Sequence, residues 1–121
     1  DIYGNVFVGD NENHLLRKIS PGGTVTTLLG PLEPSLTGTT EVFHTSALAA
    51  DKAGNLFFSI RYGIVKMTPD GNIIRYALGG VGEVDGPAQI ATYRAIGGIA
   101  VDDSDNLYIT DNNRVRKISW Q

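Results

Sequence analysis

The sequence contains no cysteine, only two histidines and few charged residues, and each scarcity narrows what the protein can be. Without cysteine, disulfide scaffolds, thiolate metal sites and cysteine nucleophiles are excluded. Charged residues make up 19% of the 121 residues and the net charge is −3, so a broad basic surface for nucleic acid is not expected. No apolar run exceeds five residues, which is too short for a membrane-spanning helix. Hydrophobic residues nevertheless make up 41%, which is enough for a packed core and excludes a disordered chain.

One sequence phrase occurs three times. The copies begin at Asp1, Asp51 and Asp102, at offsets of 50 and 51 residues. In each copy an asparagine follows the aspartate by four residues, and three apolar or aromatic residues come next. Because a repeat of this length usually forms one supersecondary unit, we interpret the chain as copies of a single unit. A second phrase follows each copy, at residues 17–20, 65–68 and 116–119.

Each copy is predicted to form short β-strands, so the expected fold class is all-β. Runs of four to seven apolar, β-branched and aromatic residues are separated by turn sequences, such as residues 51–55 and 69–71. No segment carries an apolar stripe at helical spacing for more than a turn or two. The second copy is complete, and its four strands are expected at residues 46–50, 55–60, 64–67 and 72–78.

Four short antiparallel strands repeated every 40 to 50 residues are typical of a β-propeller blade. A β-sandwich also has short strands, but it has no reason to repeat one aspartate–asparagine turn at a fixed period. We therefore predict strands two to four of a first blade at residues 1–30, a complete second blade at residues 45–79, and strands one to three of a third blade at residues 96–121.

These expected strands leave two gaps, strand one of the first blade and strand four of the last. An inner strand cannot replace an outer one, so identical copies meeting end to end would not fill them. The chain also begins with Asp1 and shows no signal segment, which we interpret as a processed protein or an excised fragment. We expect the chain to be a stretch of a larger propeller.

The first copy resembles the NHL repeat. Residues 4–20 follow the pattern of that family, and they contain Asn13-His14-Leu15, the triplet after which the family is named. The resemblance implies blades of the NHL type, of which such propellers usually have six. Architecture does not fix site chemistry, so the resemblance is specific for fold and weak for function.

The other copies depart from the family pattern in small ways. The third is similar over residues 105–118, with two residues deleted after Asp111, and the second has residues 61–63 where the family usually has an aspartate and an asparagine. The resemblance still covers nearly the whole chain. The Gly-rich connection at residues 78–88 is similar to those of NHL propellers in large secreted or surface-associated microbial proteins, which implies an extracellular or periplasmic location.

Strand alternation assigns one face of the propeller to binding. In an up-and-down blade, the turn between strands two and three lies on the same face as the crossover to the next blade. The long crossovers at residues 31–44 and 80–95 belong to this face, and loops of that length are usually functional. We expect it to bind a protein or a small ligand. The candidate binding residues are Asn11, Glu12, Asn13, His14, Arg61, Tyr62, Asn112, Asn113 and Arg114.

The sequence offers little for a metal site. His14 and His44 are the only histidines, and no spacing pairs them with further ligands. The acidic residues at 102–106 are of the type that attracts Ca²⁺, but they align with the turn at residues 51–55. We therefore expect no cofactor, and Ca²⁺ at residues 102–106 is the alternative.

Two aspartates repeat at the end of strand two. Asp10 and Asp111 each precede a strand that carries an arginine, so one interpretation is a pair of catalytic carboxylates. A catalytic group would not be expected once in every repeat. We therefore interpret both as structural turn-capping residues that pair with Arg17 and Arg116, and we predict no catalytic residue.

The sequence favours a non-catalytic interaction module within a larger secreted or surface-associated protein that includes the remaining blades. The alternative is a propeller enzyme, a metal-dependent hydrolase or a lyase-like protein, whose active site lies mostly outside this segment. The resemblance implies this alternative because related propellers include such enzymes. A third interpretation is RNA binding through a basic loop face, but acidic residues share that face and stacking aromatic residues are sparse.

Overall fold

The computed structural model describes residues 1–30, 45–60, 63–77, 82, 84–87 and 91–119, and the strands among them form three antiparallel sheets. This part of the chain contains no helix, and hence none that could cross a membrane. The fold class is all-β, as predicted. The first sheet comprises β1 (Val6–Asp10), β2 (Leu15–Ile19) and β3 (Val25–Leu29). The second comprises β4 (Leu48–Ala50), β5 (Leu56–Ile60), β6 (Gly63–Met67) and β7 (Ile73–Ala77), and the third β8 (Ile96–Val101), β9 (Leu107–Asp111) and β10 (Arg114–Ile118).

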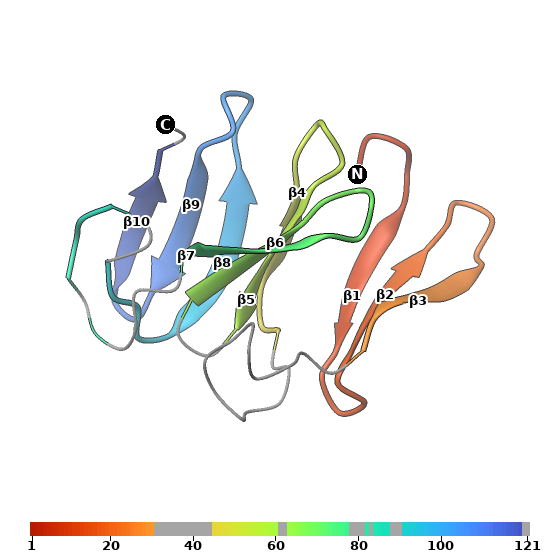
Figure 1. Ribbon diagram of the computed structural model, residues 1–121, viewed down its shortest axis with the longest axis horizontal. Helices are drawn as coiled ribbons and strands as arrows, with labels where there is room; N and C mark the ends of the chain where they lie inside the picture. The colour runs from red at the N-terminus through yellow and green to blue at the C-terminus, as the bar shows by residue number, and fades with distance from the viewer. Residues whose placement is uncertain (31–44, 61–62, 78–81, 83, 88–90, 120–121) are drawn as a thin grey trace.

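The three sheets stand side by side, with the second between the other two (Figure 1). Their order in space follows the order of the chain. The tight turns that join β4 to β5 and β8 to β9 lie along one edge of the molecule, and the loop between β1 and β2 lies along the opposite edge (Figure 1). We call the opposite edge the loop edge; it also carries the turn between β9 and β10 and the segments that lead into β4 and β8.

The repeated turn is built in the same way in all three copies. Asp51 accepts hydrogen bonds from the backbone N–H of Asn55 at 2.9 Å and from its side-chain amide at 2.8 Å. Asp1 and Asp102 hold the asparagines that follow them with the same pair of bonds. The residue before the asparagine has a positive φ, which glycine adopts without strain; it is Gly54 in the second copy (φ 86°). The sequence prediction of turns at these positions is confirmed.

Two hydrophobic clusters lie between the sheets. Between the first and second sheets, Leu16 packs with Phe58 and Val65, all fully buried. Between the second and third, Phe57 packs with Ile109, and the buried Tyr93 and Ile96 complete the cluster. Because side chains alternate along a strand, β5 contributes Phe57 to one cluster and Leu56 and Phe58 to the other, and β6 contributes Ile64 to one and Val65 to the other. The buried runs of β5 and β6 therefore reflect a sheet covered on both sides.

The strands expected in the second copy are present, but β4 is shorter than predicted. The sequence predicts a first strand from residue 46, whereas β4 begins at Leu48. The backbone N–H groups of Ser46 and Ala47 donate instead to the hydroxyl oxygen of Ser59, at 3.1 and 2.9 Å. A side-chain hydroxyl thus accepts the N–H groups of the two residues that precede β4.

Candidate functional site

The loop between β1 and β2 carries four of the candidate binding residues at the loop edge. The side-chain amide of Asn13 donates to both carboxylate oxygens of Asp10, at 3.0 and 2.9 Å, and the N–H of His14 donates to the carbonyl of Asn11 at 3.3 Å. His14 has a φ of 59°, which the tight loop requires. Glu12 and Asn13 are exposed, and Asn11 and His14 are half-buried.

This loop also forms a hydrogen bond with the segment that leads into the second sheet. The side-chain oxygen of Asn11 accepts a hydrogen bond from the backbone N–H of Thr45 at 2.9 Å, just before the chain enters the second sheet. Asn11 therefore makes a structural contact, and the binding role that the sequence suggests for it stays a prediction. Arg61 and Tyr62, and the crossover at residues 31–44 with His44, lie outside the described residues.

A two-residue turn between β9 and β10 carries the other candidates. Asn112 has a φ of 55°, and its N–H donates to the carbonyl of Ala95 at 3.1 Å. Asn112, Asn113 and Arg114 are all exposed. The turn is thus attached to the segment that leads into β8 through backbone atoms, and its side chains remain at the surface.

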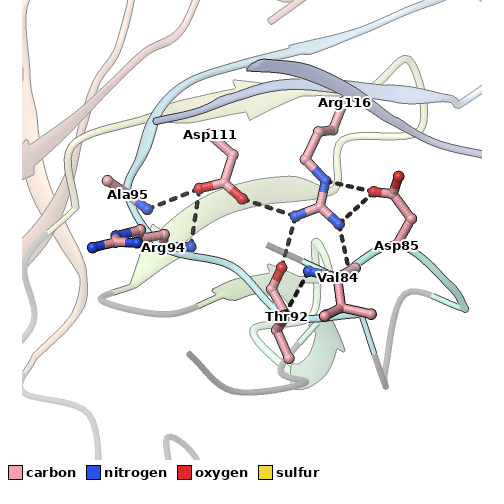
Figure 2. A network of polar contacts seen from close by, with 7 residues as sticks. All are labelled: Val84, Asp85, Thr92, Arg94, Ala95, Asp111 and Arg116. Atoms are coloured by element: carbon pink, nitrogen blue, oxygen red, sulfur yellow. Dashed lines mark hydrogen bonds and ion pairs between the residues drawn. The ribbon is translucent and has the colours of Figure 1, made fainter. Parts of the chain in front are cut away.

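The most extensive polar network lies beside this turn and centres on Arg116 (Figure 2). Its Nη1 donates to Asp111 Oδ2 at 2.8 Å and to the carbonyl of Thr92 at 2.7 Å. Its Nη2 donates to the carbonyl of Val84 at 2.9 Å and to Asp85 Oδ1 at 2.8 Å, and its Nε donates to the same carboxylate oxygen at 3.1 Å. One guanidinium thereby joins strand β10 to the segment that leads into β8.

Asp111 completes the network from the other side. Its Oδ1 accepts hydrogen bonds from the backbone N–H groups of Arg94 and Ala95, at 2.9 and 2.8 Å (Figure 2). The guanidinium of Arg116 also lies over the ring of Tyr93, 5.1 Å from its centroid. Each buried polar atom of this carboxylate therefore has a partner, which is the condition for burying a charge at low cost.

The pKa shifts follow from these contacts. Burial acts to raise the pKa of Asp111, but the hydrogen bonds from Ala95, Arg94 and Arg116 outweigh it, and the pKa is lowered. Burial likewise acts to lower the pKa of Arg116, but the two aspartates outweigh it, and the pKa is raised. Both groups are therefore ionised at neutral pH. A carboxylate held in this way is a poor general acid or base, because its proton affinity is reduced.

Part of this network was predicted from the sequence. The repeated aspartates were expected to pair with the arginines, and ion pairs are present at 2.8 Å for Arg116 with Asp111 and at 3.6 Å for Arg17 with Asp10. The expectation that Asp111 caps its own turn is wrong, because it caps the segment that leads into β8. The contact of Asp85 with Arg116 was not predicted. The one feature of the sequence that could have indicated it is an acidic residue within a Gly-rich connection.

The acidic residues at 102–106 form the repeated turn. Asp102 Oδ1 accepts the backbone N–H groups of Ser104 and Asn106, and its Oδ2 accepts the hydroxyl of Tyr108 at 3.2 Å. Hydrogen bonds from Asn106, Ser104 and Tyr108 lower the pKa of Asp102 to about 2. Within the part of the chain that the structure describes, no group of three or more histidine, aspartate or glutamate side chains is placed to hold a metal ion.

The fold is that of β-propeller proteins. No protein-family model matches the chain, and no curated protein matches it by sequence. Among solved structures, 96% of the chain superposes on a structural genomics protein of unknown function from Bacteroides thetaiotaomicron, with a TM-score of 0.74 and 19% identity. A streptogramin B lyase (TM-score 0.63) and a virginiamycin B lyase from Staphylococcus aureus (TM-score 0.61) each match 99% of the chain at 16% identity.

The chain spans only part of these structures. It covers 32% of the Bacteroides protein and 38% and 39% of the two lyases. At identities of 16–19% the likeness shows the fold alone. The NHL assignment, made on residues 4–20, therefore stays a prediction.

Proposed function

We propose that this chain is a segment of an NHL-type, six-bladed propeller that acts outside the cell as a non-catalytic binding module for a protein or a small ligand. One observation carries the proposal. At the loop edge the backbone is anchored by hydrogen bonds, whereas the side chains at the tips are exposed. A loop that is already ordered loses little entropy when it binds, so such tips favour binding.

The anchoring groups differ from the groups offered to a ligand. Asp10, Asn11 and Asp111 are used within the molecule. Glu12, in the loop between β1 and β2, and Arg114, at the start of β10, are exposed and carry charges of opposite sign. The binding surface is therefore expected to be mixed in charge and to select its partner by shape and hydrogen bonding.

A paired-variant experiment tests this function. Arrays of peptides and of oligosaccharides are probed with the wild type and with the double variant Glu12→Ala, Arg114→Ala. The matched control is Lys52→Ala, Asp70→Ala, which also removes one charge of each sign but at exposed positions on the opposite edge. We expect the wild type to bind at least one ligand on the arrays. The control should bind that ligand as the wild type does, and the loop-edge variant should bind it at least tenfold more weakly. Ligands bound equally by both variants would contradict the proposal.

The alternative is an enzyme, and the two lyases with this fold are what favour it. Its active site would lie mostly outside residues 1–121, since the buried carboxylate of Asp111 is fully engaged in structural contacts. Incubating the whole protein with virginiamycin B and following loss of the intact compound by mass spectrometry tests it. Loss of the intact compound would contradict the proposal of a non-catalytic binding module. An unchanged compound would exclude this enzyme activity.

A further inference from the structure

The network around Arg116 leaves no group of its own for a ligand. A guanidinium has five N–H donors, and each of those of Arg116 has an acceptor within the molecule. The carboxylate of Asp111 accepts three hydrogen bonds, and its side chain is only 1% exposed. Binding at this part of the loop edge therefore depends on the side chains around the network.

Two further arginines lie next to Asp111. The backbone N–H of Arg94 donates to Asp111, and the side chain of Arg94 extends away from that carboxylate (Figure 2). Arg114 pairs with Asp111 in the register of β9 and β10, so it shares one face of the third sheet with Asp111 and Arg116. Arg94 and Arg114 are both exposed, so one position in the chain brings two guanidinium groups to the surface.

The repeat does not require an arginine at position 114. The first residue of strand three is Leu15 in the first sheet and Gly63 in the second. The arginines that pair with the repeated aspartates, Arg17 and Arg116, lie two residues further along the strand. The exposed arginine at the start of strand three is therefore specific to the third copy, and a role in the repeat itself does not account for it.

The nearby carboxylates are engaged with another residue. Asp85 and Asp111 both form ion pairs with Arg116. Arg94 forms no ion pair with these or with any other carboxylate in the part of the chain that the structure describes. Its positive charge is thus available to an anionic group from outside the molecule.

The backbone that carries the two arginines is held at two points. Asp111 accepts the N–H of Arg94, and the N–H of Asn112 donates to the carbonyl of Ala95. The segment that leads into β8 and the turn before β10 are thereby tied together. A ligand that bridges two groups on an ordered backbone causes little further loss of entropy. Guanidinium groups bind carboxylates well, because their paired N–H donors match the two carboxylate oxygens.

We infer that Arg94 and Arg114 form a binding site for a carboxylate on an acidic segment of a partner protein. The inference rests on the proposed function, because it names the partner for one part of the loop edge. Val84 supports a protein as the source of the carboxylate. Its side chain is 64% exposed, and its backbone is hydrogen-bonded to Thr92, two residues before Arg94. The segment therefore has an apolar residue beside its acidic one.

Other anions are poorer occupants. The net charge of the chain is −3, and the exposed carboxylate of Asp85 lies in the same network, so the successive phosphates of a nucleic acid would be repelled. A free phosphate ion would use the arginines but gain nothing from the apolar side chain of Val84. These occupants are distinguishable by experiment.

A titration with short peptides tests the site. The probe is the capped peptide Leu-Glu-Glu-Leu, and the matched control is Leu-Gln-Gln-Leu, which differs in charge alone. We expect the glutamate peptide to shift the NMR signals of the Arg94, Asn112 and Asn113 amides, and the glutamine peptide to leave them in place. Salt at about 0.5 M should weaken the binding severalfold, because it screens exposed charges. Absent shifts, or equal shifts with both peptides, would overturn the inference.

Variants then assign the binding to the two arginines. Arg94→Gln combined with Arg114→Gln should weaken the glutamate peptide at least tenfold. The matched control, Lys52→Gln combined with Lys117→Gln, also removes two exposed positive charges and should bind the peptide as the wild type does. The backbone contact of Arg94 with Asp111 is kept, so the melting temperature of the arginine variant should be unchanged. Unchanged binding by the arginine variant would overturn the inference.

Two other probes test the source of the anion. Inorganic phosphate and a single-stranded oligothymidylate are titrated under the same conditions. Both should bind more weakly than the glutamate peptide. Equal or tighter binding of either, at the same three amides, would assign the site to that anion and overturn the acidic protein segment.

Failure of the inference is distinguishable from failure of the proposed function. A loop-edge ligand on the arrays that Arg94→Gln binds as tightly as the wild type does, together with no response to the glutamate peptide, would overturn the inference alone. Array ligands that the loop-edge variant and its control bind equally would contradict the proposed function. The peptide titration detects the arginine site directly, so it gives its result in either case.

Discussion

The second and third sheets hold the segments that lead into them by different chemistry. In the third sheet, the carboxylate of Asp111 accepts two backbone N–H groups just before β8 and is itself held by Arg116. In the second sheet, the hydroxyl of Ser59 accepts two N–H groups one position further along, those of Ser46 and Ala47, which correspond to Gly97 and Gly98 in the third sheet. The entry into the third sheet is thus held by a charged pair, and the start of the second sheet by a neutral side chain at a different position of the repeat.

The difference extends to the partner positions. The second sheet has Ile60 where the third has Asp111, and Val65 where the third has Arg116, according to the pairing registers. Both charges are thus absent together, so neither is left alone in a buried position. Because an unpaired buried charge costs several kcal/mol, a sheet of this kind tolerates both residues or neither. Each experiment below tests this comparison.

The largest effect is expected from Asp111→Ala. The variant leaves Arg116 without its buried partner and leaves two N–H groups without their acceptor, so the free energy of unfolding should fall by about 3–5 kcal/mol. Urea denaturation measures the loss. The control is Asp10→Ala in the first sheet, where the ion pair is longer and more exposed and the loss should be about 1 kcal/mol or less. Equal losses in the two variants would show that the network around Asp111 stabilises the fold no more than the pair of Asp10 and Arg17.

A smaller loss is expected when both charges are replaced together. The double variant Asp111→Ile, Arg116→Val gives the third sheet the residues of the second. It should be destabilised by about 2 kcal/mol, less than Asp111→Ala, because no buried charge is left alone. The two N–H groups lose their acceptor and the carbonyls of Thr92 and Val84 lose a donor, while Asp85 is exposed to solvent. Urea denaturation of Asp111→Ile, Arg116→Val and the double variant completes a double-mutant cycle. A double variant less stable than Asp111→Ala would contradict the idea that the sheet tolerates both charges or neither.

Ser59→Ala tests the neutral acceptor in the second sheet. The variant removes the acceptor of the Ser46 and Ala47 N–H groups, so a loss of about 1–2 kcal/mol is expected. Ser104→Ala, at an exposed turn position, is the matched control and should change stability little. Amide hydrogen exchange at Ser46 and Ala47 should also become faster in the variant. Unchanged exchange would mean that the hydroxyl does not hold this segment.

The smallest effect concerns the repeated turn. In the third sheet, Tyr108 donates to Asp102, whereas the second sheet has Phe57 at that position and lacks this donor. Asp102 has a pKa lowered to about 2, so its stabilising contribution is present above about pH 4 and is lost as the pH falls toward 2. Tyr108→Phe should move the pKa of Asp102 upward and start that loss at a higher pH. An NMR titration of the carboxyl carbon measures the change, and an unmoved pKa would exclude the tyrosine as a cause.

The parts of the fold that repeat were the parts that could be predicted. The aspartate–asparagine turns, the strands between them and their all-β class follow from local patterns, since turn geometry and side-chain alternation depend on neighbouring residues. The first strand of the second copy was predicted too long, because the N–H groups of Ser46 and Ala47 are taken by Ser59, twelve or more residues away. No local pattern indicates that contact.

The candidate site was predicted less completely. The loop edge and its exposed residues follow from strand alternation, but the structural use of Asn11 does not, since its partner Thr45 lies 34 residues away. Asp85 reaches Arg116 from 31 residues away, through a connection whose composition shows no regular period. Contacts of this kind depend on how the sheets pack.

The sequence alone determined which residues form strands and turns and that one unit occurs three times, because these properties arise from interactions over a few residues. Only the tertiary structure decided which copy of each residue is buried. Leu16 and Val115 occupy the same position in the repeat, yet Leu16 is fully buried and Val115 is 76% exposed. The physical reason is that burial belongs to the interface between two sheets, and a side chain is covered only where another sheet lies against it.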